Sequence, residues 1–230
     1  SYASSTTYVT GKAVEKACMK LQEQMKCIAA GMMQCDAEDV VFEGELLRKK
    51  DTEETVSVKD VSYKAQVSET HNVQVTATHT SPVSPPPFMV GMAEIELDPE
   101  TGKVDVLEYK AVVDCGIPIN PALARIQTEG GIVQGIGMAL MENVTYSKKG
   151  RIAENSLMQY KIPSRVDVGH LQVEFEQSYE PTGPFGAKSI GEIVINTPSP
   201  AIAHAIYRAT GVWHRDLPIT PEAVFMEKKH

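Results

Sequence analysis

A short run of prolines constrains this sequence more than any other feature. Four of them lie within the six residues from Pro82 to Pro87. Each proline fixes φ and removes a backbone donor, so the run has to be extended and cannot lie inside a helix or a central strand. The sequence therefore predicts one domain over residues 1–230 with a possible sub-boundary near residues 81–87.

Before the prolines, the spacing of apolar residues predicts helices. Apolar side chains recur at steps of three and four from about Val9 to Met33, with Lys and Glu between them. This is the pattern of an amphipathic helix. A short strand is expected over Val40–Leu47, and a weaker helix over Val58–Glu69.

The clearest strand signal is a hairpin after the prolines. Apolar and acidic residues alternate over Ala93–Leu97, and apolar and charged residues alternate again over Lys103–Val106. The segment Asp98–Gly102 between them has the composition of a turn. The apolar run Tyr109–Cys115 predicts that the returning strand ends in a buried position.

The rest of the chain mixes helices and strands. Asn120 before Pro121 is typical of a helix start, and this helix should run to about Met141. A strand over Leu171–Phe175 and a last helix from near Pro198 are expected to follow. Because there is no internal repeat and no regular βαβ rhythm, the expected fold class is α+β, with mixed helices and β-hairpins.

Charge and hydropathy exclude several classes of partner. Thirty acidic residues against 22 basic ones give a net charge of −8. Duplex DNA and anionic membranes need clustered Lys and Arg, so neither a nucleic acid nor a membrane is expected as partner. No apolar run approaches the roughly 18 residues of a membrane helix. We therefore expect a soluble, cytoplasmic protein.

The cysteines and histidines show no metal-binding pattern. Cys18, Cys27, Cys35 and Cys115 match no metal or redox spacing, and no two of the six histidines are four residues apart. The four cysteines are expected to be reduced, buried thiols. No protein-ligated metal is expected.

A glycine-rich stretch lies inside the helix expected after Asn120. Four glycines fall between Gly130 and Gly137, and each costs about 1 kcal/mol relative to alanine in a helix. They either allow a neighbouring backbone to pack closely or face a ligand. Gln127 and Gln134 are seven residues apart and share one helical face with them. The residues alone leave both interpretations open.

An irregular loop delivers one carboxylate to the edge of an apolar run. The loop Glu180–Glu192 contains several glycines and prolines, and Ile193–Ile195 follow at once. Glu192 is expected to be desolvated there, which would raise its pKa toward the range of a general base. The alternative is that Glu192 caps a nearby helix or pairs with Lys188.

A cluster of hydroxyl groups precedes the first helix. The segment Ala3–Thr7 contains two serines and two threonines. Such a cluster usually caps a helix, and it can also hold an anion, because the amides of a first helical turn favour negative charge.

Four segments, taken in order, resemble one family. Ala3–Gly11, Gly116–Pro121, Gln127–Gly137 and Gly186–Glu192 together resemble the C-terminal part of the molybdenum-binding subunit of xanthine dehydrogenase and its molybdenum hydroxylase relatives, the aldehyde oxidases among them. The resemblance spans nearly the whole chain. It implies the fold of the C-terminal portion of the molybdopterin-binding domain.

The resemblance also implies roles for individual residues. Glu192 would be the general base of a hydroxylation at the molybdenum centre, and Ala3, Ser4, Thr6 and Gln127 match positions that contact the pterin cofactor. Together with the glycine-rich helix and the loop, this gives a set of expected cofactor contacts: Ala3, Ser4, Thr6, Gln127, Gly130, Gly131, Gln134, Lys188 and Gly191.

The implied cofactor and partners extend beyond this chain. The molybdenum–molybdopterin cofactor would be shared with the remaining part of the molybdenum subunit, and iron–sulfur clusters and FAD would lie on other domains or subunits. The substrate would be a purine-like N-heterocycle or an aldehyde. We expect the chain to be an excised fragment or a naturally split subunit that is inactive by itself. The alternative is a non-catalytic scaffold or binding module derived from the family.

Overall fold

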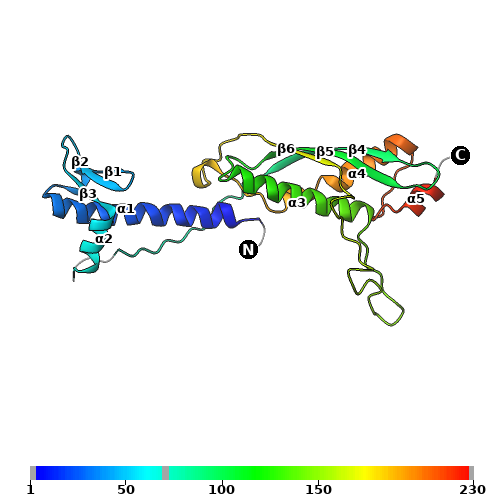
Figure 1. Ribbon diagram of the computed structural model, residues 1–230, viewed down its shortest axis with the longest axis horizontal. Helices are drawn as coiled ribbons and strands as arrows, with labels where there is room; N and C mark the ends of the chain where they lie inside the picture. The colour runs from blue at the N-terminus through cyan, green and yellow to red at the C-terminus, as the bar shows by residue number, and fades with distance from the viewer. Residues whose placement is uncertain (1–3, 69–72, 228–230) are drawn as a thin grey trace. The chain divides into compact units, whose positions relative to one another are not determined.

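The computed structural model describes residues 4–68 and 73–227 and divides the chain into two compact units. Residues Val9–Pro82 form one unit, here called the insert unit. The other, the sheet unit, combines the residues up to Tyr8 with those from Val83 onward. The insert unit is therefore a continuous stretch of chain, whereas the sheet unit is built from two separated stretches. Figure 1 shows the elements of both units.

The insert unit packs two helices against a small antiparallel sheet. Its core joins Met25 and Ile28 on the first helix to Leu47 on a strand and Val61 on the second helix. The elements are the π-helix η1 (Thr6–Thr10), which leads in from the sheet unit, α1 (Gly11–Met33), η2 (Ala37–Asp39), β1 (Val40–Glu43), β2 (Leu46–Lys49), β3 (Thr55–Ser57) and α2 (Val58–Gln66). Both expected helices are confirmed, but α2 ends at Gln66, before the expected end at Glu69, which itself lies outside the described residues.

The strand expected over Val40–Leu47 is two strands. β1 and β2 pair antiparallel, with Val40 opposite Lys49 and Glu43 opposite Leu46. Gly44 between them has a φ of +63°, a conformation that glycine adopts without steric cost. The prediction was wrong at this point because Gly44 lies within an otherwise apolar and acidic run that reads as one strand.

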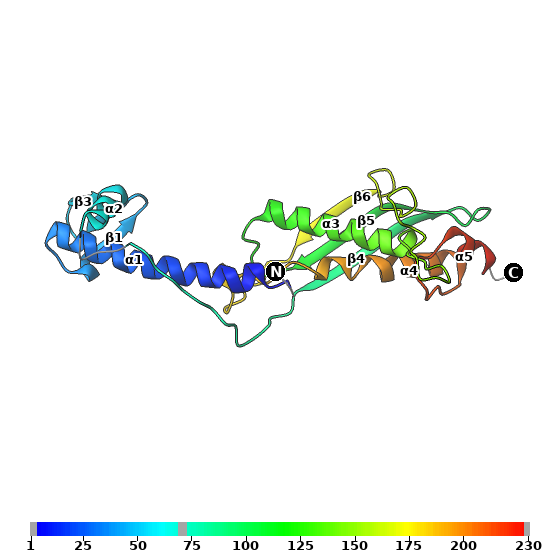
Figure 2. The same cartoon turned by 90° about the horizontal axis from the view of Figure 1, so that it is seen from below.

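The sheet unit is a three-stranded sheet with two helices packed on it. The order is β4-β5-β6, and the buried core joins Tyr109 of β5 to Ile132 and Ile136 of α3 and to Ile202 and Ile206 of α4. The helices lie along the sheet in both views (Figures 1 and 2). The elements are β4 (Phe88–Leu97), β5 (Val104–Asp114), α3 (Pro121–Leu140), β6 (His170–Phe175), η3 (Pro184–Gly186), η4 (Ile193–Ile195), α4 (Pro198–Thr210) and α5 (Pro221–Met226).

The hairpin, the cap at Asn120 and the α+β class are confirmed. β4 and β5 pair antiparallel from Phe88–Asp114 to Leu97–Val104, and Asn120 Oδ1 accepts the N–H of Leu123 at 3.1 Å. The expected strand over Leu171–Phe175 is confirmed as β6, which pairs parallel with β5. One feature differs from expectation: α4 is not the last helix, because α5 follows it.

One face of β4 is apolar and exposed. Phe88, Val90 and Met92 alternate with side chains that face the core, and they are 60%, 68% and 63% exposed. They belong to the sheet face opposite to that of the core residues. No helix in the described part of the chain is long and apolar enough to cross a membrane.

Candidate functional site

The site is built where the end of β5 meets the loop before α4. The N–H of Lys188 donates to the carbonyl of Cys115 at 2.7 Å, and the N–H of Ile117 donates to the carbonyl of Gly186 at 2.9 Å. Gly116 lies between these bonds with a φ of +69°, and a Cβ there would come within 2.3 Å of the Gly186 oxygen. A glycine is therefore required at this position, and the strand end and the loop are held together.

A mostly buried ion pair reinforces this junction. Lys188 Nζ lies 2.7 Å from Asp114 Oδ2, and the two side chains are only 12% and 19% exposed. Asp114 Oδ1 also accepts the Ser178 hydroxyl at 2.6 Å and the N–H of Gly116 at 3.0 Å. Burial opposes ionisation of Asp114, but hydrogen bonds from Lys188, Ser178 and Gly116 outweigh it and hold its pKa below the usual value.

Glu192 stands at the other end of the loop and is exposed. Its N–H donates to Ser4 Oγ at 2.7 Å, and Ser4 Oγ donates to its Oε2 at 3.0 Å. The expected burial of this carboxylate is wrong for this chain, because the described residues leave the side chain open to solvent. The alternative also fails among the described residues, since the Glu192 side chain makes no capping bond to η4, the helix that follows it, and Lys188 is engaged by Asp114.

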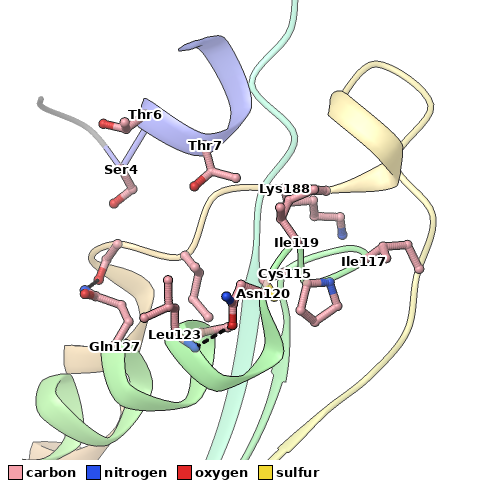
Figure 3. Close-up of a pocket in the computed structure, with 15 residues that line it drawn as sticks. Ser4, Thr6, Thr7, Cys115, Ile117, Ile119, Asn120, Leu123, Gln127 and Lys188 are labelled. Carbon is pink, nitrogen blue, oxygen red and sulfur yellow. Dashed lines mark hydrogen bonds between the residues drawn. The ribbon is translucent and has the colours of Figure 1, made fainter. Parts of the chain in front are cut away.

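Two pockets adjoin in the sheet unit. The first, of about 450 Å³, is called the hydroxyl pocket because Ser4, Thr6 and Thr7 line it. Figure 3 shows Ser4 and Thr7 on one side of it and Gln127 on the other. The second, of about 580 Å³, is called the glutamate pocket because Glu192 lines it. Gln127 and Gly191 line both, and Gln127 Nε2 donates to the Gly191 carbonyl at 3.2 Å.

The structure brings the described members of the expected site together, and only Ala3 lies outside the described residues. They fall into three groups by pocket: Ser4, Thr6 and Lys188 line the hydroxyl pocket, Gly130, Gly131, Gln134 and Glu192 line the glutamate pocket, and Gln127 and Gly191 line both. Segments that are far apart in the sequence thus form one continuous surface.

Some glycines of α3 allow close packing, as one interpretation of the sequence had it, and one faces open space where a ligand could lie, as the other had it. A Cβ at Gly131 would lie 2.2 Å from Val194 Cγ2, and one at Gly135 would lie 2.7 Å from Pro198 Cγ. These two glycines allow close packing. A Cβ at Gly130 would meet no atom within 4 Å, so this glycine faces open space in the glutamate pocket.

Sequence reasoning missed Asp114 and Ser178. Neither belongs to a motif, and Ser178 lies in an irregular segment after β6. One sequence signal could have found Asp114: it is a charged residue that directly follows the apolar run of β5 and lies two residues before Gly116.

The cysteines are only partly as expected. All four are free, but Cys18 and Cys27 are exposed and Cys35 is half-buried, so the expectation of buried thiols is wrong for them. Cys115 is buried and lines the hydroxyl pocket, and this burial raises its pKa to about 11. Within residues 4–68 and 73–227, no group of three or more His, Cys, Asp or Glu side chains could hold a metal ion.

The fold recurs in a known class of enzyme subunits. The chain superposes along 100% of its length on 31% of quinoline 2-oxidoreductase from Pseudomonas putida 86, with a TM-score of 0.84 and 27% identity. It is 32% identical over 234 residues to the 6-hydroxypseudooxynicotine dehydrogenase complex subunit gamma of Paenarthrobacter nicotinovorans, covering 98% of this chain and 30% of that subunit. It is 33% identical over 229 residues to the probable hypoxanthine oxidase XdhD of Escherichia coli K12, covering 97% of this chain and 23% of that protein.

The family follows from these matches and from a family model. The model described as "Molybdopterin cofactor-binding domain" matches residues 1–169. The chain belongs to this molybdopterin cofactor-binding domain family of xanthine dehydrogenase and carbon monoxide dehydrogenase large subunits, which confirms the family resemblance. It spans between 23% and 31% of the lengths of the three proteins named above.

Proposed function

We propose that this chain forms one part of the active site of a molybdenum hydroxylase and that Glu192 is its general base. The observation that carries the proposal is the position of Glu192 on the glutamate pocket, beside the hydroxyl pocket with which it shares Gln127 and Gly191. The substrate would be a purine-like N-heterocycle or an aldehyde. The remaining part of the molybdenum subunit would enclose the carboxylate that this chain leaves exposed.

The residues that line the two pockets fit a pterin cofactor. Hydroxyls and side-chain amides both donate and accept hydrogen bonds, as Thr6, Gln127 and Gln134 can, which suits the mixed edges of a pterin and its phosphate. Gly130 leaves open space on the helix face, and both pockets are in the size range of cofactor sites. When bound, the molybdenum–pterin group would supply the redox chemistry.

The chain's own residues would hold the cofactor and move a proton. Thr6, Gln127 and Gln134 would bind the cofactor through their side chains, and Gly130 would allow its close approach, whereas Gly131 and Gly191 leave room for Val194 and Ser4. Glu192 would accept a proton at its carboxylate as the substrate is hydroxylated. The charge of Lys188 is largely balanced by Asp114, so Lys188 would contribute to the hydroxyl pocket mainly through its stem and backbone. Electrons would leave through iron–sulfur clusters and FAD on other domains or subunits.

The test is Glu192→Gln in the assembled holoenzyme, purified with its natural partner polypeptides. The variant keeps the size of the side chain but removes the base, so kcat should fall at least about 10²-fold to 10⁴-fold. Molybdenum and pterin contents should stay near the wild-type values. The matched control is Glu100→Gln, which should keep full turnover because Glu100 is exposed, lines neither pocket and lies in the β4–β5 turn, at the opposite end of β5 from Cys115.

Two outcomes would contradict the proposal. If Glu192→Gln retains more than about a tenth of wild-type kcat, Glu192 is not the base. If the natively purified wild-type complex contains neither molybdenum nor pterin, the chain is a binding or scaffold module instead.

A further inference from the structure

Ser4 and Glu192 share two hydrogen bonds across 188 residues of sequence. The Glu192 N–H donates to Ser4 Oγ at 2.7 Å, and Ser4 Oγ donates to Glu192 Oε2 at 3.0 Å. One hydroxyl thus binds both the backbone and the carboxylate of the same residue. Such a pair of bonds fixes the side chain of Glu192 relative to its own main chain.

The bonding capacity of a hydroxyl limits what else Ser4 can bind. A serine hydroxyl has one proton to donate and two lone pairs to accept with. In this structure the proton of Ser4 is donated to Glu192 and one lone pair accepts the Glu192 N–H. The hydroxyl therefore has no proton left for a phosphate or a pterin oxygen, even though Ser4 lines the hydroxyl pocket.

The surroundings are built to keep Ser4 at this place. A Cβ on Gly191 would lie 2.4 Å from Ser4 Oγ, so only a glycine beside Glu192 leaves room for the serine. Gln127 holds the same peptide from the other side through its bond to the Gly191 carbonyl. Ser4 itself has a φ of +52°, a conformation that is uncommon for residues other than glycine and that the local structure has to maintain.

We infer that Ser4 is a positioning residue for the Glu192 carboxylate rather than a ligand of the cofactor. This inference rests on the proposed function of Glu192 as the base. A carboxylate that is exposed on a flexible side chain has several rotamers, and the bond from Ser4 selects one of them. Loss of the bond would leave the base present but misoriented, which lowers the rate of the chemical step without weakening cofactor binding.

The test compares Ser4→Gly and Ser4→Ala in the holoenzyme. Both remove the hydroxyl, and glycine accepts the positive φ, so Ser4→Gly is not expected to impair folding. We expect kcat to fall about 10-fold to 100-fold in both, with KM within twofold of wild type. Molybdenum and pterin contents should be unchanged. The matched control is Ser62→Ala on the exposed side of α2, which removes a hydroxyl from the insert unit and should leave all four quantities unchanged.

A combined variant separates this inference from the proposed function. In the Glu192→Gln background, Ser4→Gly should cause no further loss of the residual rate, because the carboxylate that Ser4 orients is already gone. Loss of molybdenum or pterin in Ser4→Gly would overturn the inference, and so would a wild-type kcat in that variant. The inference would also fail if Ser4→Gly lowered the residual rate of Glu192→Gln by the same factor as it lowers the rate of the wild type. High activity of Glu192→Gln by itself would instead contradict the proposed function.

Discussion

The side chain of Val194 fills the space that a side chain on Gly131 would need, since a Cβ there would lie 2.2 Å from Val194 Cγ2. Val194 belongs to η4, two residues after Glu192, and is almost fully buried. The contact between α3 and η4 therefore sets how closely the segment that carries Glu192 approaches the helix. At Gly131 the cost of a glycine in a helix is offset by this packing.

The first prediction contrasts two neighbouring glycines. Gly131→Ala should lower the free energy of unfolding by about 1–3 kcal/mol, because the added methyl group overpacks against Val194. Gly130→Ala should raise it by up to about 1 kcal/mol, because alanine is the better helix former and nothing lies within 4 Å. Thermal and denaturant unfolding of both variants measures this. Equal destabilisation by the two changes would contradict the assignment of Gly130 to open space.

A second prediction concerns a bulky residue at Gly130. Gly130→Val in the holoenzyme should reduce pterin content, because its side chain would enter the glutamate pocket. The Tm should change little, since no packed atom is displaced. Wild-type pterin content in a folded Gly130→Val variant would mean that the cofactor does not approach this part of α3.

The third prediction concerns the Asp114–Lys188 pair. Lys188→Met should destabilise the protein by about 1–3 kcal/mol at neutral pH, because it leaves a mostly buried carboxylate without its cation. The matched double variant Asp114→Asn with Lys188→Met should recover part of this loss, since no uncompensated charge remains. Urea unfolding of the wild type, Lys188→Met, Asp114→Asn and the double variant gives the coupling free energy between the two side chains.

The pH dependence of the same pair has a defined sign. The pKa of Asp114 is lowered in the folded protein relative to its ordinary value of 3.8. Its ionised form therefore stabilises the fold above that ordinary value, and this contribution is lost as the pH falls through the lowered pKa. Wild-type protein should lose more stability on acidification than Asp114→Asn. A steeper acid loss in Asp114→Asn would contradict this assignment.

The fourth prediction orders the thiols by reactivity. Only about a thousandth of a thiol with a pKa near 11 is ionised at pH 8, so Cys115 should resist alkylation in the folded protein. Cys18 and Cys27 are exposed and should react first with iodoacetamide. Mass spectrometry of the time course measures this order, and denatured protein, in which all four should react, is the control.

The fifth prediction concerns the 230-residue chain purified alone. It should fold, because both units have their own buried cores, but retain no stoichiometric molybdopterin, because the proposed site is shared with further polypeptide. It should also self-associate through the exposed apolar side chains of β4, and Val90→Ser should weaken this association. Light scattering and metal analysis test both parts. A monomer with stoichiometric molybdenum and pterin would mean that the site is self-contained.

Local patterns predicted the parts of the fold that depend on local chemistry. The periodicity of α1, the Asn120 cap and the β4–β5 hairpin all arise from interactions within a few residues. The parallel pairing of β6 with β5 could not be predicted, because it depends on long-range packing beneath α3 and α4. The short helix α5 has too few residues for a visible period.

In the candidate site, too, the sequence predicted some features and missed those that depend on distant neighbours. Motif resemblance found the residues that line the two pockets, but it could not show that Glu192 is exposed in this chain or that Lys188 is engaged by Asp114. Nor could it separate Gly130, which faces open space, from Gly131, which packs on Val194. These differences depend on neighbours that are 60 or more positions away in the sequence, so no local pattern contains them.

The span of chain between Ser4 and Glu192 also sets an order of events during synthesis. At about 5–20 residues per second, the glutamate is made roughly 10–40 seconds after the serine. The insert unit is continuous and can fold while the ribosome is still extending the chain. The sheet unit has to wait, because Ser4 meets its partner only after most of the sequence has been translated. A nascent chain interrupted before Glu192 would therefore present Ser4 without the carboxylate and the backbone N–H that it binds in the finished chain.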